Sequence, residues 1–331
     1  MFRNKSIFVT GATGSFGQAF VSHLIKNHSN FKRLVVFSRD ELKQFEMKND
    51  DLLKKHHKKI RFFVGDIRDK ERLMNAFNRV DYVIHAAALK QVDTAEYNPF
   101  EFIKTNIQGT ENVIQAAAAN SVKKLIALST DKAVSPINLY GATKLCADKL
   151  IIAANNIFGN KKTGFSLVRY GNVMGSRGSI VPLFKRQLKE KKSFLVTDPS
   201  MTRFNLTLKE CVETVMWALK KTIGGEIIIR KSPSYKLIDV AKAISSKNKV
   251  NIIGARPGEK KHEELIPDSG NCYIYESGNY YILIDKVLKE NVSKIKKNYK
   301  LKKEIESFSY NSKDNKKFLT QNQLKKLINI N

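Results

Sequence analysis

The sequence predicts an α/β protein with a doubly wound, mostly parallel sheet and a smaller second lobe. Short apolar runs alternate with helical patterns through the first half of the chain, as a parallel sheet covered by helices on both faces requires. A glycine-rich loop follows the first apolar run. The 331 residues suffice for one large domain with a smaller companion, and 42% hydrophobic residues with seven prolines are typical of a globular chain.

The predicted strands are apolar runs bounded by turn signals. They cover Ile7–Thr10, Leu34–Phe37, Arg61–Val64, Tyr82–His85, Leu125–Leu128 and Phe165–Arg169. The helical patterns that separate them include Gln18–Lys26, Glu71–Phe77, Gly109–Ala119 and Lys144–Ile157. After Arg169 the alternation becomes irregular and turn-rich, which indicates a change of architecture.

The loop after the first strand reads Thr10-Gly11-Ala12-Thr13-Gly14-Ser15-Phe16-Gly17 and runs into a predicted helix. Glycines at this spacing permit a tight turn and bring a pyrophosphate close to the helix N-terminus. An ordinary strand-to-helix turn is the alternative interpretation. The strand before the loop and the helix after it favour a Rossmann-type dinucleotide site.

Three parts are therefore expected along the chain. Residues 1–170 form the Rossmann domain, and a helical pattern within 203–221 returns to pack on it. Residues 171–285 form a substrate-binding lobe. Residues 286–331 are rich in lysine and are expected to be an exposed C-terminal appendage.

Charge limits the classes of partner. The chain has 59 Lys and Arg against 31 Asp and Glu, a formal net charge of +28, which fits either a nucleic-acid or membrane-surface protein or a lysine-rich solvated surface. No nucleic-acid-binding motif accompanies the charge, so the solvated surface is favoured. Signal peptides and membrane-spanning segments are not recognised, so a cytoplasmic protein is expected. The three cysteines lack metal-ligand spacing, and no metal site is predicted.

The end of the second predicted strand favours NADP over NAD. Ser38-Arg39 stands where an NAD enzyme commonly places an acidic group, and an arginine there can pair with a 2′-phosphate. Asp40 is expected to cap the next helix. Asp66 could accept a hydrogen bond from adenine, with a plain turn aspartate as the alternative. The small residues Ala86-Ala87-Ala88 fit cofactor contact or simple packing.

The candidate chemistry lies after the fifth predicted strand. This strand ends in Ser129-Thr130-Asp131-Lys132, and Tyr140 and Lys144 follow on one helix face. An ammonium near the phenol would lower the pKa of Tyr140, so that the tyrosinate could take a proton from a substrate hydroxyl as hydride leaves. Polar residues at the carboxyl end of a strand lie where open α/β sheets bind ligands.

Longer motifs make the sequence similar to the extended short-chain dehydrogenases/reductases and, more narrowly, to the inverting UDP-N-acetylglucosamine 4,6-dehydratases. The likeness runs from about Ile7 to Pro267. Its segments are residues 38–43, 85–90, 95–99, 138–145, 169–173, 175–179, 201–204 and 256–260. The resemblance implies tightly bound NADP, a UDP-sugar substrate, a homo-oligomer and a product for pseudaminic acid or related deoxyamino-sugar pathways.

The resemblance also implies roles for residues. Tyr140 with Lys144 serves oxidation of carbon 4, Thr130 holds the 4-oxygen, and Asp131 and Lys132 form the acid–base couple for loss of water across carbons 5 and 6. Related glucose dehydratases carry Asp-Glu there, and a lysine base is consistent with reprotonation from the opposite face. The cofactor residues are Gly11, Thr13, Gly14, Ser15, Phe16, Gly17, Ser38, Arg39, Lys43, Asp66, Ile67, Ala86, Ala87, Ala88, Asn106, Ser129, Tyr140 and Lys144.

The substrate is expected to be bound mainly by arginines, because guanidinium groups match phosphate oxygens. The candidates are Lys90, Tyr170, Asn172, Val173, Arg177, Arg203, Arg256 and Glu259. Gln91 departs from the resembled family, which usually has a basic or imidazole side chain at this place, so sugar specificity is less defined. The alternatives are a retaining dehydratase, a UDP-sugar 4-epimerase, or a Rossmann-fold nucleotide sensor or nucleic-acid-binding module.

Overall fold

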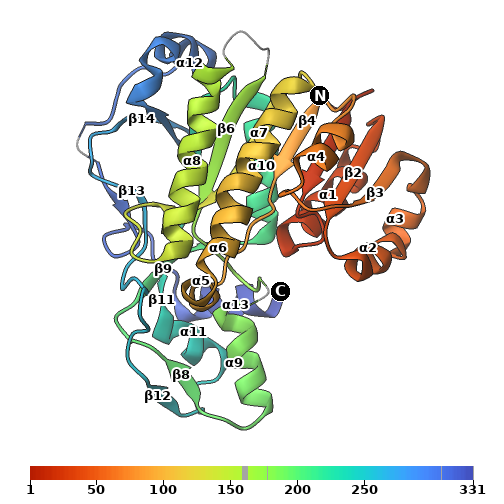
Figure 1. Cartoon of the computed structure of the whole chain (residues 1–331). Helices are drawn as coiled ribbons and strands as arrows, with labels where there is room; N and C mark the ends of the chain where they lie inside the picture. The colour runs from red at the N-terminus through yellow and green to blue at the C-terminus, as the bar shows by residue number, and fades with distance from the viewer. Residues whose placement is uncertain (159–162, 177, 307, 331) are drawn as a thin grey trace.

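The large sheet of the computed structural model has nine strands in the order β14-β15-β10-β6-β5-β4-β1-β2-β3. The structure describes residues 1–158, 163–176, 178–306 and 308–330. Strands β3 to β10 of this order are all parallel, and β15 and β14 add an antiparallel edge. The predicted fold class, a doubly wound and mostly parallel sheet, is therefore confirmed (Figure 1).

All six predicted strands are present, each extended by one or more residues at one or both ends except β4. Their bounds are β1 Ser6–Thr10, β2 Arg33–Ser38, β3 Ile60–Val64, β4 Tyr82–His85, β5 Lys124–Thr130 and β6 Gly164–Tyr170. The inner strands are buried on both faces, as the run of fully buried residues in β1 illustrates. Continuous burial explains why these strands appear in the sequence as unbroken apolar runs.

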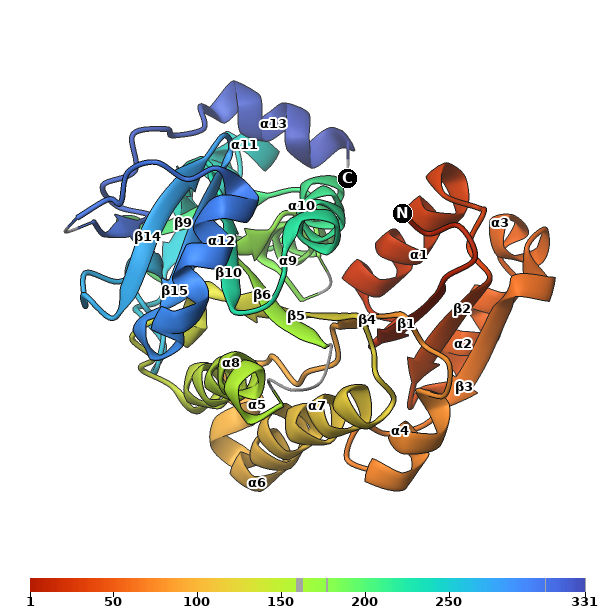
Figure 2. The ribbon, with the colours of Figure 1, turned by 90° about the horizontal axis from the view of Figure 1, so that it is seen from above.

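Helices cover both faces of the sheet (Figure 2). One face carries α1 and α10, which contact each other, and the other carries α4, α7 and α8. The helices of the first half are α1 Ser15–Asn27, α2 Glu41–Lys48, α3 Asp51–Lys54, α4 Lys70–Ala76, α5 Val92–Tyr97, α6 Pro99–Phe102, α7 Gly109–Ala119 and α8 Leu139–Ile157, with the 3-10 turns η1 His57–Lys59 and η3 Asp131–Ala133 and the π-helix η2 Ile103–Gln108. No helix within the described ranges is long and apolar enough to cross a bilayer.

The chain returns to the large sheet after the sixth strand. Helix α10, Leu208–Lys221, begins with a capping box in which Thr207 and Glu210 exchange hydrogen bonds. It packs on α1 and on strands β5, β6 and β10. Strands β10 Glu226–Arg230, β14 Cys272–Ser277 and β15 Tyr280–Asp285 then join the sheet edge.

This return changes the expected boundaries. The range 171–285, predicted as one substrate-binding lobe, contains three strands of the large sheet. The apolar run Ile227-Ile228-Ile229 is buried in the main core, and it is the kind of signal that identified the first six strands. The boundary was misplaced because the turn-rich segments around this run masked the alternation.

The smaller lobe is discontinuous and lies below the sheet in Figure 1. It has a three-stranded sheet, β11-β9-β7, a parallel pair, β12-β8, and an antiparallel pair, β13-β16. Its own core packs around Phe184, Phe194 and Val240. The elements are β7 Asn172–Val173, α9 Ile180–Lys189, β8 Phe194–Val196, β9 Thr202–Leu206, β11 Ser234–Lys236, α11 Leu237–Ile244, β12 Val250–Ile252 and β13 Glu264–Ile266.

The C-terminal segment 286–331 is not the exposed appendage that its lysines predicted. Leu288 and Ile295 are buried in the main core, whereas Leu324 and Ile328 are buried in the core of the small lobe. Apolar residues spaced by four or seven positions give a helix one buried stripe, with the lysines on the opposite side. The elements are η4 Lys286–Asn291, α12 Val292–Tyr299, β16 Tyr310–Asn311 and α13 Gln321–Ile330.

Candidate active site

A cavity of about 740 Å³ lies at the carboxyl ends of the parallel strands, between the large sheet and the small lobe. It joins a second cavity of about 230 Å³ through four shared residues, which include Gly11 and Lys43. Every predicted cofactor residue except Asn106 lines one of the two cavities. The predicted cofactor and substrate residues thus face one continuous space.

The glycine loop is built for close backbone approach. Gly11 has a positive φ of 64°, and a Cβ there would lie 2.8 Å from the Cα and N of Ala87. At Gly17 a Cβ would lie 2.5 Å from the backbone of Ala12, so this glycine allows α1 to pack tightly on the loop that follows β1. These are two of the roles that a dinucleotide-binding loop gives its glycines.

Helix α1 points its N-terminus at the larger cavity. Gly14 is the N-cap residue in an extended conformation, and Gly14, Ser15 and Phe16 line the cavity wall. The first turn of a helix directs backbone N–H groups and a partial positive charge outward. The loop and this helix end therefore fit the pyrophosphate of a dinucleotide.

A buried histidine supports the loop from below. The amides of Ala86 and Ala87 donate to Thr10 Oγ1, which lies 2.8 Å from Nδ1 of His85. On its other side His85 Nε2 lies 3.1 Å from Thr110 Oγ1. Burial lowers the pKa of His85 to about 3, so the ring is neutral. Through Thr10, the ring holds in place the residues that follow β4 and line the cavities.

The second cavity has the groups expected around an adenosine. It is lined by Ser38, Arg39, Lys43, Asp66 and Ile67. Arg39 is half exposed and lies 3.5 Å from Asp66. Burial alone would raise the pKa of Asp66, but hydrogen bonds from Arg68 lower it below its ordinary value.

Both oxygens of Asp66 accept hydrogen bonds from Arg68, one from its amide and one from its side chain. Arg68 therefore fixes the orientation of this carboxylate, and Asp66 also lines the second cavity. Asp40 accepts from the amide of Lys43 and caps α2, as predicted.

Asn106 lies behind the cavity wall. It is 1% exposed, and its amide group exchanges hydrogen bonds with both backbone groups of Leu89 and donates to Thr143. Asn106 therefore ties the loop after β4 to helix α8. Asn106 stabilises the cavity wall from behind and is not among the residues that line either cavity.

Tyr140 and Lys144 lie one turn apart on α8, and both line the cavity. Burial raises the pKa of Tyr140 to about 12, although the charge of Lys132 and a hydrogen bond with Thr130 act to lower it. The predicted lowering is therefore wrong for the protein alone, because the loss of water outweighs the neighbouring cation. Lys144 donates to the carbonyl of Leu128 at 2.8 Å, and burial lowers its pKa.

Three buried polar groups connect β5, α8 and β6 beneath Lys144. Ser129 donates to Asp148 at 2.5 Å, and Arg169 donates to the same carboxylate oxygen at 3.1 Å. Asp148 is 2% exposed and lies one turn beyond Lys144. Such a paired network fixes the floor of the site, since each charge has a partner. Sequence reasoning missed Asp148 and the bridging role of Arg169.

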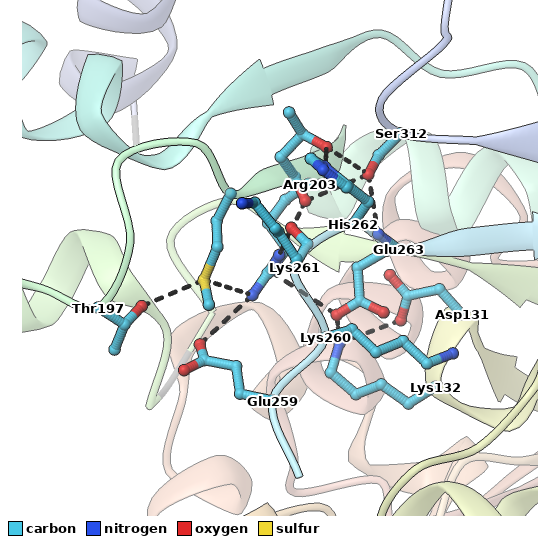
Figure 3. Close-up of polar contacts among 12 residues, drawn as sticks. Asp131, Lys132, Thr197, Arg203, Glu259, Lys260, Lys261, His262, Glu263 and Ser312 are labelled. Carbon is cyan, nitrogen blue, oxygen red and sulfur yellow. Dashed lines mark hydrogen bonds and ion pairs between the residues drawn. The ribbon is translucent and has the colours of Figure 1, made fainter. Parts of the chain in front are cut away.

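The predicted acid–base couple is an ion pair. Lys132 Nζ lies 3.1 Å from Asp131 Oδ1 and also 3.1 Å from Glu263 Oε1 (Figure 3). Burial and the charge of Glu263 raise the pKa of Asp131. Burial acts to lower the pKa of Lys132, but the two carboxylates raise it above its ordinary value. Lys132 is therefore an ammonium in this state.

Arg203 is a buried member of the same group (Figure 3). It is 5% exposed, donates to the carbonyls of Thr202 and Lys261, and lies 3.3 Å from Glu259 and 3.7 Å from Glu263. Its edge reaches the cavity. Arg203 thus holds the small lobe's charged wall together while still facing the space for substrate.

Most of the other predicted substrate residues also line the cavity. These are Lys90, Tyr170, Asn172, Val173, Arg256 and Glu259. Arg256 is exposed and contacts Glu259 and Asp93. The loop that carries it docks on α8, because Asn138 donates to the carbonyl of Gly258 at 2.8 Å. Arg177, also predicted, lies outside the described residues.

The cavity residues that the sequence analysis did not predict include Tyr235, Lys260 and Glu263. Burial raises the pKa of Tyr235 to about 12 and lowers that of Lys260. Lys260 ends the segment 256–260 that carries the family resemblance, and Glu263 follows three residues later. The carboxylate so close to this segment is the signal that could have identified Glu263. No motif in the sequence around Tyr235 distinguishes it from a tyrosine that is simply buried in the core.

Comparison with known proteins places this geometry in a family. Residues 7–285 match the model of the polysaccharide biosynthesis protein family. A UDP-N-acetylglucosamine 4,6-dehydratase (inverting) of Campylobacter jejuni is 48% identical over 99% of this chain and 98% of its own length. A UDP-glucose 4-epimerase of Rickettsia bellii is 45% identical, covering 85% of this chain and 83% of its own.

A solved structure supports the same placement. The X-ray structure of Pen from Bacillus thuringiensis has a TM-score of 0.89 and 37% sequence identity, covering 100% of this chain and 99% of that one. The shared length includes the small lobe and the C-terminal segment. The chain therefore belongs to the polysaccharide biosynthesis protein family and is similar, over almost its whole length, to inverting UDP-N-acetylglucosamine 4,6-dehydratases.

Proposed function

We propose that this protein is an NADP-dependent UDP-N-acetylglucosamine 4,6-dehydratase that inverts carbon 5. It would oxidise carbon 4, eliminate water across carbons 5 and 6, and form a UDP-4-keto-6-deoxy-L-hexosamine. The observation that carries the proposal is that Lys132, which forms an ion pair with the buried Asp131, lines the same cavity as Tyr140 and the glycine loop. The relative named for this reaction, 48% identical, supports the choice of substrate.

The cofactor would be held mainly by backbone groups of the protein. Gly11 to Gly17 and the end of α1 would hold the pyrophosphate, and Arg39 with Lys43 would face the adenosine 2′-phosphate. Ser129, Tyr140 and Lys144 would face the nicotinamide end. A bound nicotinamide supplies the hydride acceptor for carbon 4 and the donor for carbon 6.

Oxidation of carbon 4 needs a group that takes the proton of the 4-hydroxyl. Tyr140 has this role, with Thr130 holding the same oxygen. The ammonium of Lys132 favours the tyrosinate, since its charge acts to lower the pKa of Tyr140. Lys144 donates a hydrogen bond to the Leu128 carbonyl, which fixes its place beside Tyr140 on α8.

Elimination then uses the ion pair. Transfer of one proton from Lys132 Nζ to Asp131 Oδ1, across their 3.1 Å hydrogen bond, gives a neutral amine and a neutral carboxylic acid together. The raised pKa of Asp131 favours this transfer, whereas the raised pKa of Lys132 opposes it. The amine takes the proton of carbon 5, which the 4-ketone has acidified, and Asp131 protonates the 6-hydroxyl as it leaves as water.

The step restores the starting charges. Lys132 becomes an ammonium with the carbon 5 proton, and Asp131 becomes a carboxylate after giving its proton to water. No proton is drawn from solvent. Lysine differs from the glutamate of related glucose dehydratases in reach and charge. Hydride return to carbon 6 requires one proton at carbon 5, which is balanced by the proton taken from the 4-hydroxyl during oxidation, and inversion requires that this proton reach the face opposite the one that Lys132 deprotonated.

A 4-epimerase is the second candidate, because a relative with that name is 45% identical. Epimerisation needs proton transfer at the 4-oxygen and no acid or base at carbons 5 and 6. A buried trio of Asp131, Lys132 and Glu263 would then carry a desolvation penalty without a chemical use. The trio therefore favours the dehydratase.

The test is product analysis. Purified protein is incubated with UDP-N-acetylglucosamine, and the product is examined by mass spectrometry and proton NMR. We expect loss of one water, a methyl signal at carbon 6, ring couplings of an inverted carbon 5 and no net reduction of cofactor. An unchanged mass with a shifted carbon 4 would identify an epimerase, and retained couplings at carbon 5 would identify a retaining dehydratase.

We also propose a homo-oligomer that works in the cytoplasm. Tyr97 and Phe100 support assembly, since they are 88% and 70% exposed on neighbouring helices α5 and α6, and exposed apolar patches commonly mark contact surfaces. Light scattering of the purified protein tests the oligomer, and a monomeric mass would reject it.

A further inference from the structure

The C-terminal segment reaches the catalytic wall. Strand β16, Tyr310–Asn311, pairs with β13 of the small lobe, and Ser312 follows it. The family model ends at residue 285, so this segment lies beyond the matched region. Relatives that align over almost the whole chain share the segment, but the family match itself does not describe its contact with the site.

Ser312 is fully buried and fixes the residue before β13 (Figure 3). The amide of Glu263 donates to Ser312 Oγ at 2.9 Å, and the amide of Ser312 donates to the carbonyl of Glu263 at 2.7 Å. Ser312 Oγ also lies 2.7 Å from Thr202 Oγ1 on β9. These contacts join the C-terminal segment, β9 and Glu263 in one rigid unit.

Glu263 in turn holds the catalytic lysine. Its Oε1 lies 3.1 Å from Lys132 Nζ and 3.7 Å from Arg203 Nε, and its side chain is 2% exposed. Its other oxygen is buried with no hydrogen-bond partner among the described residues. A buried carboxylate placed so close to the lysine restricts where that nitrogen can lie.

The two carboxylates beside Lys132 have different tasks. Asp131 changes its charge during the elimination, because it takes a proton from Lys132 and passes it to the leaving hydroxyl. Once Asp131 is protonated it no longer attracts Lys132 by charge, so Asp131 alone cannot hold the lysine nitrogen in place during the elimination. Glu263 takes no part in the transfer and stays ionised, since it faces both Lys132 and Arg203.

We propose that Glu263 is a positioning residue that keeps Lys132 aimed at carbon 5 throughout the proton transfer, and that the C-terminal segment holds Glu263 in place through Ser312. The inference rests on the proposed dehydratase function. It assigns a part of the catalytic wall to a segment that looks, in sequence, like a solvated tail.

The experiment compares Glu263→Gln and Ser312→Ala with the matched control Glu264→Gln. Glu264 is the next carboxylate in β13, and it accepts hydrogen bonds from Ser135 and Ser309, outside the cavity. Measured quantities are kcat, KM, bound nicotinamide, melting temperature, and the absorbance of reduced nicotinamide after rapid mixing with UDP-N-acetylglucosamine.

We expect Glu263→Gln to lower kcat roughly 100-fold, near the lower end of what general base catalysis contributes, with KM unchanged. Reduced nicotinamide should accumulate, because oxidation at carbon 4 proceeds while elimination is slow. Ser312→Ala should lower kcat about tenfold with the same accumulation, because the Glu263 amide loses its hydrogen bond to Ser312 Oγ. Glu264→Gln should match the unmodified protein.

Several results would overturn the proposal. Normal kcat in Glu263→Gln, or a lowered kcat with no accumulated reduced nicotinamide, would show that Glu263 does not act on elimination. If Glu263→Gln does not fold, Ser312→Ala decides by the same absorbance. Failure of the unmodified protein to dehydrate the sugar would instead reject the proposed function, so the two failures are distinguishable.

Discussion

The nucleotide side and the substrate side of the cleft are built in different ways. On the nucleotide side the groups that face the cavity come largely from one continuous loop and from the first turn of α1, and they act through the backbone. On the substrate side, charged side chains from η3, β9 and the segment before β13 meet in a buried cluster. The nucleotide side therefore depends on close approach to the backbone, whereas the substrate side depends on paired charges.

The difference teaches which changes each side tolerates. A backbone cradle depends on the absence of side-chain atoms, so adding a methyl group is the damaging change. A charge cluster depends on every partner, because removal of one member leaves another buried and unpaired. The predictions below test this contrast, from the largest expected effect to the smallest.

The largest effect is expected at Lys132. In Lys132→Ala the carbon 5 proton has no base, so kcat should fall by about 10²- to 10⁴-fold, the contribution of general acid–base catalysis. Bound nicotinamide should stay at its normal level, since the nucleotide side is untouched. Lys149→Ala is the control, because Lys149 forms an ion pair with Asp285 far from the cavity. Dehydration with inversion at the normal rate in Lys132→Ala would remove the proposed role.

The matching change on the nucleotide side is Gly11→Ala. The new methyl group would lie 2.8 Å from the backbone of Ala87, and overpacking combined with left-handed strain costs roughly 2–5 kcal/mol. We expect cofactor affinity to fall about 100-fold, measured by titration of the apoprotein.

Gly278→Ala is the control for Gly11→Ala. Gly278 has a similar positive φ of 57°, but nothing lies within 4 Å of its added Cβ. It should lose about 1–2 kcal/mol of stability and no cofactor affinity. Equal loss of affinity in the two variants would mean that backbone strain, not close approach, explains the glycine at position 11.

A smaller effect is expected where the nucleotide side does use a charge. Arg39→Ala should raise the Kd of NADP about 10- to 100-fold, because a charged hydrogen bond contributes roughly 1.5–3 kcal/mol. The Kd of NAD should not change. Isothermal titration with each dinucleotide separates the two, and equal weakening of both would contradict a 2′-phosphate contact.

The smallest effect concerns the histidine beneath the loop. His85 has a folded pKa of about 3 against an ordinary 6.5, so the unfolded chain binds a proton that the folded chain excludes. The stability contribution is therefore complete above pH 6.5 and is lost as pH falls toward 3.

Between pH 6.5 and about 5.5 the free energy of unfolding should fall by about 1 kcal/mol because of His85. Urea unfolding at the two values measures it, and His85→Gln, which keeps a polar group between Thr10 and Thr110, should show a smaller fall. Equal falls in both proteins would mean that His85 already titrates freely.

Most residues that the sequence assigned to the nucleotide side line the two cavities. Fold class, the six first strands and the loop from Gly11 to Gly17 were recognised because each is a local pattern, a buried run or a set of glycines at fixed spacing. Asn106 is the exception, because it was predicted to contact the cofactor but lies behind the cavity wall. Its position depends on how η2 packs against α8, which the sequence pattern does not reveal.

The substrate side was predicted only in part. Asp131 and Lys132 are neighbours in the chain and could be found, but Glu263 is more than a hundred residues away and joins them through the fold. The raised pKa of Tyr140 was missed for the same reason, since burial is a property of the packed site. Long-range packing also explains why the lysine-rich C-terminal segment hides two buried stripes.

The position of Ser312 near the end of the chain has a consequence for biosynthesis. The cradle for the nucleotide comes from the first residues to leave the ribosome, whereas the support of Glu263 is among the last. A polypeptide truncated by early termination or by proteolytic trimming would retain the dinucleotide cradle yet lack that support. Cofactor content alone is therefore a poor measure of how much of a preparation is intact enzyme.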